Sequence, residues 1–379
     1  MQLPRHAEKW LLPYLKDRMG RALRKLEPTR IWVAITDHYE PFGREGSMPA
    51  ALKRVAAWRE KWPRIADEAP RDSAGSRPQY TFFYPQEEYR REIIDEVAEI
   101  VRLGVADVEV HLHHDKDNRE SFARKIREFC QRLIEEHGLL RQVNGKTVFG
   151  FIHGNWALDN SRPDGRWCGV SGEIELLREL GCYADFTMPS APSPTQSRVV
   201  NQVYWCTNRP DHRPRSFDRG VPATFNGGRC GDLLMFTGPL GLRCRKNWLP
   251  RLETGEIASY DLPTPSRVRN WFNLAPAIGA DLFLKLYAHG GNDQNLQPLL
   301  SGGLVNLYRW CAEEAERKGI EIHWVTAWQM YQVADALIHG SPIRPPQKPE
   351  ANSGDCACAG QQRLKGAFDS GRESGKESI

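Results

Sequence analysis

The sequence predicts an α/β protein that folds as a single (β/α)7–8 barrel-like domain. Short apolar runs rich in Val, Ile, Phe and Tyr recur along the chain, and such runs are typical of buried strands. Segments whose apolar residues have helical spacing separate these runs. Alternating strands and helices form a parallel sheet, and seven or eight such units are typical of a closed or nearly closed barrel.

Eight segments have the composition of strands. They are residues 31–36, 80–84, 107–112, 147–152, 184–188, 232–237, 281–287 and 321–326. Helical spacing predicts helices over 88–103, 119–137, 296–318 and 327–338. A further helix is expected over 172–181, with Ser171 as its N-cap and Gly181 as its end.

Composition divides the chain into three parts. Residues 1–29 are an N-terminal amphipathic helical segment, and residues 30–341 carry the strand–helix pattern of the barrel. Within the barrel, residues 189–230 are rich in Pro, Ser, Arg and Asn, which predicts a long loop at its mouth. Residues 342–379 are dominated by Pro, Lys, Ser, Gly and Glu, which predicts a disordered tail.

Charge and cysteine content favour a cytoplasmic enzyme. The 379 residues carry a net charge of only +4, which does not favour nucleic acid as a partner. The nine cysteines form no C-x-x-C pair, as expected of a reduced protein. No signal peptide is recognisable, and no stretch approaches the ~18 apolar residues of a membrane span.

Residues 10–26 are the one segment that suggests a membrane partner. Leucines and a methionine recur there at helical spacing, and lysines and arginines occupy the other faces. We expect this helix to pack on the main domain, because basic amphipathic helices commonly do so. The alternative is peripheral contact with a membrane surface. The sequence does not predict an oligomeric state.

Histidines concentrate at the ends of the predicted strands, where the active site of a parallel barrel lies. The histidines placed there come from four strands, and they are His38, His111, His113, His153 and His289, with His114 beside them. Such convergence on one rim favours a functional site over isolated structural histidines.

The segment "HLHHD" (111–115) predicts a metal site. In an extended strand His111 and His113 face the same side, whereas a helical turn would bring Asp115 beside His111. Either arrangement supplies two ligands, and Asp37 or His38 is the nearest candidate for a third. Imidazole and carboxylate suit zinc or a similar divalent ion, and three protein ligands with an open position make a catalytic site.

The ordered motifs resemble the polysaccharide deacetylase family, the NodB-homology barrels. The family has an acidic pair after its first strand, where this chain has "ITDHYEPF" (35–42), and a T-F-F sequence, here residues 81–83. Its histidine metal motif resembles "HLHHD", and its later motifs resemble "SRPDGRW" (161–167) and "LKLYAHG" (284–290). The likeness spans roughly residues 30–330.

The resemblance implies roles for individual residues. Asp37 takes the place of the general base and His38 that of the metal-binding aspartate, so that Asp-His replaces the usual Asp-Asp. His111 with His113 or Asp115 would complete the metal site. His289 resembles the acid that protonates the leaving amine, and Arg162 would position the base or the loop. These replacements indicate a divergent branch of the family.

The sequence therefore predicts a metal-dependent hydrolase, with zinc as the expected ion. Its expected reaction is the deacetylation of N-acetylated amino sugars in a surface polysaccharide or its precursor, a cleavage of C–N bonds that are not peptide bonds. The expected substrate-binding residues are His153, Asn155, Trp156 and Arg162.

Other functions remain open. One is a glycoside hydrolase with two carboxylates, for which the candidates are Asp37, Glu40, Glu109 and Asp185. Another is a glycan-binding barrel without catalysis, and a third is an amidohydrolase that acts on a small non-sugar amide.

Overall fold

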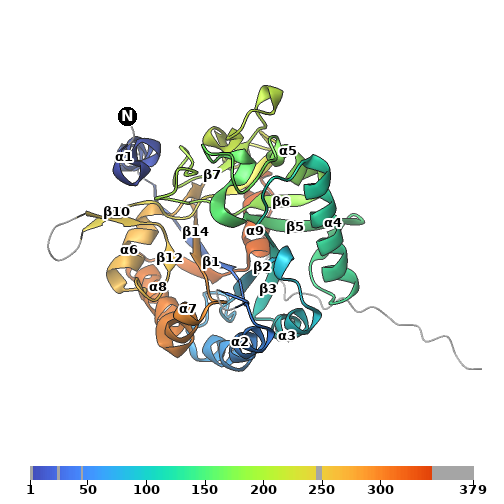
Figure 1. Cartoon of the computed structure of the whole chain (residues 1–379). Helices are drawn as coiled ribbons and strands as arrows, with labels where there is room; N and C mark the ends of the chain where they lie inside the picture. Colours follow the sequence, from blue (N-terminus) through green and yellow to red (C-terminus); the bar gives the residue numbers. More distant parts are fainter. Residues whose placement is uncertain (1–2, 24–25, 44–45, 245–249, 344–379) are drawn as a thin grey trace, which may run out of the picture.

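The computed structural model describes residues 3–23, 26–43, 46–244 and 250–343. It shows an α/β fold, as predicted. A 13-stranded, mostly parallel sheet has the strand order β12-β14-β1-β2-β3-β5-β6-β9-β7-β8, and three further strands pair beside this path. Helices surround the strands (Figure 1). The predicted disordered tail, 342–379, lies outside the described residues apart from its first two positions.

Each of the eight predicted strands is present. They are β1 (Arg30–His38), β2 (Tyr80–Pro85), β3 (Ala106–Leu112), β5 (Lys146–His153), β6 (Cys182–Asp185), β9 (Leu233–Phe236), β14 (Asp281–Ala288) and β15 (Glu321–Trp324).

The sheet also contains strands that the sequence analysis does not identify. They are β4 (Arg141–Val143), β7 (Val203–Cys206), β8 (Val221–Pro222), β12 (Glu256–Ile257) and β13 (Ala277–Ile278). Two more, β10 (Gly241–Cys244) and β11 (Pro250–Glu253), form a separate hairpin sheet. Since β7 and β8 fall within 189–230, that segment is not entirely loop.

Parallel pairing brings the carboxyl ends of five strands to one edge of the sheet. β1 pairs with β14 up to Asp37 and Ala288, and with β2 up to His38 and Phe83. β2 pairs with β3, and β3 pairs with β5 up to Leu112 and His153. Residues that follow these strands therefore meet at this edge, which is where the histidines lie.

The helices follow the predicted alternation. They are α1 (Ala7–Leu23), α2 (Met48–Glu68), α3 (Arg91–Arg102), α4 (Arg119–Glu135), α5 (Glu173–Glu179), α6 (Pro265–Leu274), α7 (Asp293–Pro298), α8 (Leu304–Lys318) and α9 (Ala327–Ile338). A π-helical turn over Leu299–Gly303 separates α7 from α8, where one helix is predicted. The N-cap of α5 is Gly172 in a left-handed conformation, and not the predicted Ser171.

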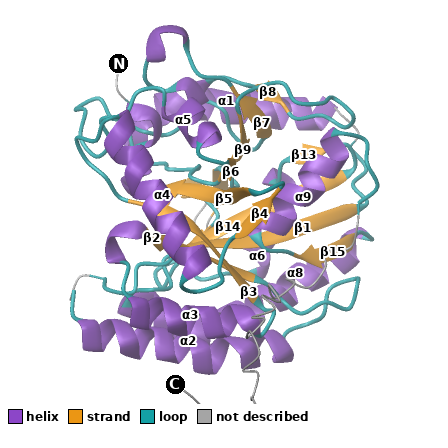
Figure 2. Cartoon of the chain, turned by 90° about the vertical axis from the view of Figure 1, so that its right-hand side faces the viewer, coloured by secondary structure: helices purple, strands orange, loops and turns teal. Residues whose placement is uncertain are grey.

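The two faces of β1 are buried in different cores. Ile31, Val33 and Ile35 join the core formed with the covering helices. Trp32 and Ala34 alternate with them and join a second core. Figure 2 shows α2 and α3 side by side below the strands. Because both faces are covered, the strands are nearly continuous apolar runs, as is usual in parallel sheets.

Helix α1 packs on the domain through part of its surface. Trp10 is buried with Val200 and Leu240, and the Arg21 guanidinium group donates hydrogen bonds to the carbonyl oxygens of Asn201 and Ala275. The outer surface of α1 exposes Leu12, Leu15, Met19 and Leu23. Among the described residues, no helix has the length and apolar character needed to cross a membrane.

Candidate metal centre at the strand ends

Five side chains meet at the carboxyl edge of the sheet, and we call them the rim group: His38, Glu40, His111, His113 and His289. His38 is the last residue of β1, and Glu40 follows it by two positions. β3 carries His111 and leads into His113, and His289 comes directly after β14. The parallel register thus explains why residues so distant in the sequence lie together.

Glu40 lies at the centre of the rim group. Its Oε1 atom is 3.4 Å from Nε2 of His111 and 3.3 Å from Nε2 of His113. The ligand atoms of these three residues lie within 4.8 Å of one another, and the same holds for His38, Glu40 and His289. Glu40 therefore belongs to both sets, each of which has the size of a metal-binding group.

Neighbouring oxygens orient two of the rim imidazoles. Nδ1 of His111 lies 3.0 Å from the carbonyl oxygen of Ile152, which can only accept, so Nδ1 carries the hydrogen and Nε2 presents its lone pair. Nδ1 of His113 lies 2.5 Å from Oε1 of Glu87, while its Nε2 faces Glu40. Histidines that bind metals usually have such a partner on the second nitrogen.

The charges of the rim group are arranged around Glu40. Burial opposes a charge on Glu40, but its close contacts with His111 and His113 outweigh burial and hold the pKa of Glu40 well below its usual value. Burial would also lower the pKa of His113, whereas its bonds to Glu40 and Glu87 raise that pKa to about 10. Burial lowers the pKa of His38, so this imidazole is neutral, as a metal ligand must be.

The rim group opens to solvent on one side. His38 and His111 are buried, while the side chains of Glu40, His113 and His289 are 28%, 29% and 18% exposed. The half-buried Trp156 has its ring centroid 5.9 Å from that of His38 and 6.0 Å from that of His289. A ligand can therefore approach the imidazoles beside an aromatic surface.

Asp37 lies beside the rim group, on the opposite face of β1 from His38. Its carboxyl group is fully buried and accepts hydrogen bonds from the Gly290 amide at 2.7 Å and the Tyr80 hydroxyl at 2.9 Å. Burial raises the pKa of Asp37 to about 6, and those two bonds oppose the increase. Asp37 is thus fixed next to the loop that carries His289.

One predicted metal ligand, Asp115, turns away from the rim. The strand β3 continues through His111 to Leu112, so the helical turn that would bring Asp115 back to His111 does not form. Asp115 is exposed and accepts a hydrogen bond from the Trp167 amide at 2.7 Å. The prediction that Asp115 stands beside His111 is therefore wrong, whereas the alternative, with His113, matches the geometry.

Two predicted substrate-binding residues, Arg162 and Asn155, lie in the loop after β5. The Arg162 guanidinium group pairs with Asp164 at 2.5 Å and stacks 4.1 Å from the centroid of the Trp167 ring, so it is held within its own loop instead of against Asp37. Asn155 is half-buried and has a left-handed backbone (φ 54°) directly before Trp156.

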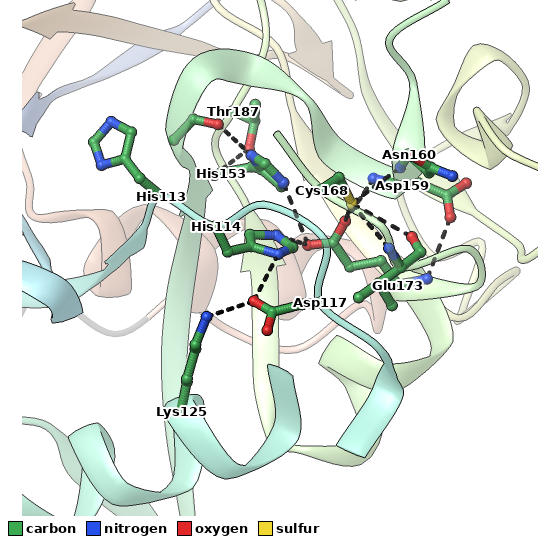
Figure 3. Close-up of polar contacts among 12 residues, drawn as sticks. His113, His114, Asp117, Lys125, His153, Asp159, Asn160, Cys168, Glu173 and Thr187 are labelled. Carbon is green, nitrogen blue, oxygen red and sulfur yellow. Dashed lines mark hydrogen bonds and ion pairs between the residues drawn. The ribbon is translucent and has the colours of Figure 1, made fainter. Parts of the chain in front are cut away.

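His153 belongs to a second set, the buried group of His114, His153, Cys168 and Glu173. Figure 3 shows their side chains pointing toward one another while His113 points away. All four residues are buried, and their ligand atoms lie within 4.8 Å of one another, so this group can bind a metal ion. His153 accordingly has no exposed surface for the substrate contact that the sequence suggests.

Sequence reasoning misses Glu40 as a member of the rim group and Glu87 as the neighbour of His113. A signal for Glu40 exists, because it follows His38 by two positions at a strand end. Glu87 begins no recognisable motif, and it reaches His113 only because β2 and β3 are paired. Cys168 and Glu173 lie in a loop and at a helix start, with a spacing that no simple metal motif uses.

A comparison of the chain with protein-family models and with curated protein sequences finds no match.

Proposed function

We propose that the protein is a metal-dependent hydrolase that removes the acetyl group from N-acetylated amino sugars of a surface polysaccharide or its precursor. The observation that carries the proposal is the position of Glu40 between His111 and His113 at a solvent-open strand edge. Catalytic metal sites keep an open coordination position, whereas structural sites are closed by protein ligands. The order of the motifs that resemble the deacetylase barrels supports the choice of substrate.

The donor atoms of the rim group fit a divalent ion such as zinc. Glu40, His111 and His113 would hold it, because their ligand atoms lie within 4.8 Å of one another and three protein ligands leave a coordination position open. His111 Nε2 is buried without a hydrogen bond, and His38 lies beside this set through its own grouping with Glu40 and His289. When bound, the ion would supply Lewis-acid chemistry, which polarises an amide carbonyl and lowers the pKa of water.

The side chains around this position would handle protons and substrate. His289 is partly exposed, and its Nδ1 lies 3.7 Å from Oε1 of Glu256, which orients the ring. We assign to His289 the delivery of a proton to the leaving amine, because an amine leaves poorly until it is protonated. Trp156 offers a flat apolar face on which a sugar ring can stack.

Asp37 has the pKa of a general base but not the exposure of one. Both of its oxygens accept hydrogen bonds, and its bond to the Gly290 amide fixes the residue next to His289. We propose that Asp37 positions His289 through this backbone contact and maintains a negative charge behind the ring. The role of base that the resemblance implies would require the Asp37 carboxylate to exchange one of these bonds for water.

Contacts across the interior support a barrel-like closure of the sheet, which we include in the proposal. Six pairings separate β9 from β14 in the strand order. Nevertheless, the ring centroids of Phe236 on β9 and Phe283 on β14 are 6.1 Å apart. Nζ of Lys285 also donates to the carbonyl oxygens of Phe186 and Met188 at 2.7 Å each.

Two of the four carboxylates of the glycoside hydrolase alternative, Glu109 and Asp185, are occupied elsewhere. Glu109 accepts hydrogen bonds from Arg141, Tyr183 and the Gly150 amide. Asp185 accepts from the amide and the hydroxyl of Thr187. Both are fully buried, so they cannot flank an exposed glycosidic bond.

Acetate release from N-acetylglucosamine oligomers tests the proposal. The full chain is loaded with zinc, and acetate and new reducing ends are both measured, beside His111→Ala. We expect acetate without new reducing ends from the wild type, and loss of acetate release in the variant. New reducing ends without acetate, or equal acetate release by the variant, would overturn the deacetylase assignment.

The exposed face of α1 is a candidate membrane-binding surface of the proposed enzyme. Leu12, Leu15, Met19 and Leu23 follow one another at intervals of three or four residues, so they form one exposed apolar stripe. Lys16 and Arg18 are exposed on the same helix. We propose that this stripe rests on an anionic membrane surface.

A further inference from the structure

We propose that the buried group of His114, His153, Cys168 and Glu173 is a structural zinc site, separate from the rim group and independent of the proposed hydrolase activity. The four residues supply two imidazole nitrogens, one sulfur and one carboxylate oxygen. This donor set and number match a closed, four-coordinate zinc site.

Distances within the buried group leave the ligand atoms close but poorly hydrogen-bonded. Oε1 of Glu173 is 3.6 Å from Nε2 of His114 and 3.9 Å from Nε2 of His153. The centroids of the two imidazole rings are 4.6 Å apart. Sγ of Cys168 is 3.4 Å from Oε2 of Glu173.

Several of these buried atoms have no hydrogen-bond partner among the described residues. They are Nε2 of both histidines and Oε1 of Glu173, while Nδ1 of His114 has an ion-pair contact with Asp117 but no hydrogen bond. Burying a polar atom without a partner costs free energy, and native structures rarely leave several together. An ion at their centre would satisfy Nε2 of His114, Nε2 of His153 and Oε1 of Glu173 at once.

Neighbouring groups hold the ligands from behind, as is usual around bound zinc. Nδ1 of His114 lies 3.2 Å from Oδ2 of Asp117, a carboxylate that Lys125 and Ser121 also contact. Oε2 of Glu173 accepts a hydrogen bond from the Asp159 amide at 2.6 Å.

His153 has a comparable neighbour, since its Nδ1 contacts the carbonyl oxygen of Gly154. Figure 3 shows the contacts that run from His114 through Asp117 to Lys125. Because the oxygen behind each ring holds Nδ1, both imidazoles can present Nε2 to an ion.

The ligands come from three separate parts of the chain, which gives the ion a structural role. His114 follows β3, His153 ends β5, and Glu173 begins α5, while Cys168 lies in the loop between β5 and α5. Zinc would therefore fasten this loop, which also carries Trp156, to two strand ends. Binding requires the Cys168 thiol to lose its proton to solvent, so that the sulfur binds as a thiolate.

Cobalt substitution distinguishes this site from the rim, because only the buried group contains sulfur. The full chain is freed of metal, reloaded with Co²⁺ and examined for a near-ultraviolet charge-transfer band from thiolate to metal. We expect the band in the wild type and in His111→Ala, and its loss in Cys168→Ser. A Cys356→Ser/Cys358→Ser control should retain the band, which excludes the cysteines of the tail as its source.

Zinc content provides a second reading. Cys168→Ser and Glu173→Gln should each contain about one zinc fewer per chain than the wild type, and chelators should lower the wild-type Tm. The band of the wild type is a required result by itself. The proposal can therefore still fail if one of the variants does not fold. A cobalt-loaded wild type without the band, or a Cys168→Ser variant that keeps it, would overturn the structural site whether or not acetate is released.

Discussion

His113 and His114 are consecutive residues whose side chains belong to different clusters. The His113 imidazole lies between Glu40 and Glu87, at the open edge of the sheet. The His114 imidazole lies between Asp117 and Glu173, in the interior. The segment after β3 thus connects an exposed group suited to catalysis with a buried group suited to structure.

Glu87→Gln tests whether the outer contact of His113 matters for metal binding. The amide would remove the negative charge that holds Nδ1 and makes the imidazole more basic. Loss of such a contact typically costs about 10- to 100-fold in metal affinity, and we expect a decrease of that order at the rim, measured by competition with a chelator. Glu60→Gln, an exposed residue paired with Arg64 at 3.7 Å, is the matched control. Equal affinities in Glu87→Gln and the wild type would show that the charge of Glu87 does not contribute to metal binding at the rim.

Gly291→Ala tests how closely the loop after β14 packs on Glu40. A Cβ atom at Gly291 would lie 2.6–2.7 Å from backbone atoms of Glu40, which cannot swing aside as a side chain can. We expect a loss of roughly 1–3 kcal/mol in the free energy of unfolding, together with weaker metal binding at the rim. Urea unfolding measures the first effect.

Gly20→Ala is the control for Gly291→Ala. Gly20 lies in α1, and a Cβ atom there would meet nothing within 4 Å. Alanine is the better helix former, so this variant should gain up to about 1 kcal/mol. A stable Gly291→Ala variant with normal metal binding would contradict the described packing.

Asp185→Asn tests the burial of Asp185 through pH. Burial raises the pKa of Asp185 to about 7, while hydrogen bonds from Thr187 oppose the increase. The unfolded chain releases this proton near pH 4, so between about pH 4 and 7 the folded state binds more protons. As the pH rises through this range, the free energy of unfolding of the wild type relative to Asp185→Asn should therefore fall by about 1 kcal/mol per pH unit. A pH-independent difference in urea midpoints would mean that Asp185 is ionised in the folded state.

The apolar stripe of α1 is tested with vesicles. Leu15→Glu/Met19→Glu places two negative charges on the stripe, and both positions are exposed, so the fold should be unaffected. We expect the wild type to sediment with vesicles that contain phosphatidylglycerol, and the double variant to remain in the supernatant. Lys146→Glu, an exposed change far from α1 in the sequence, controls for net charge. Equal sedimentation of the wild type and the double variant would rule out this surface.

The strand ends could be predicted because they are local features of the sequence. An apolar β-branched run that stops at a histidine specifies both the strand and the side chain that follows it, and for this reason His38, His111, His113 and His289 are found together. Helix α2 is not predicted, although Ser47 caps it and Pro49 lies in its first turn, because its apolar face consists largely of alanine and tryptophan between charged residues.

The buried group depends on a path of the backbone that residue patterns do not reveal. Between β5 and α5 the chain turns through left-handed conformations at Asn155, Trp156, Asp159, Asn160 and Trp167. These turns carry Cys168 and Glu173 back to His114. Non-glycine residues seldom adopt this conformation, so the sequence gives no reason to expect it. For the same reason the sequence analysis names Asp115 as a candidate metal ligand and does not identify Asp117 as the carboxylate beside His114.

Zinc titration of the metal-free chain tests the central claim, that the rim group binds a catalytic ion, most directly. Calorimetry compares the wild type with His111→Ala, and with His339→Ala, which removes an exposed histidine at the end of α9. We predict that His111→Ala binds about one equivalent fewer than the wild type, whereas His339→Ala binds the same amount. Unchanged stoichiometry and affinity in His111→Ala would contradict the claim, because the rim group would then not hold the ion.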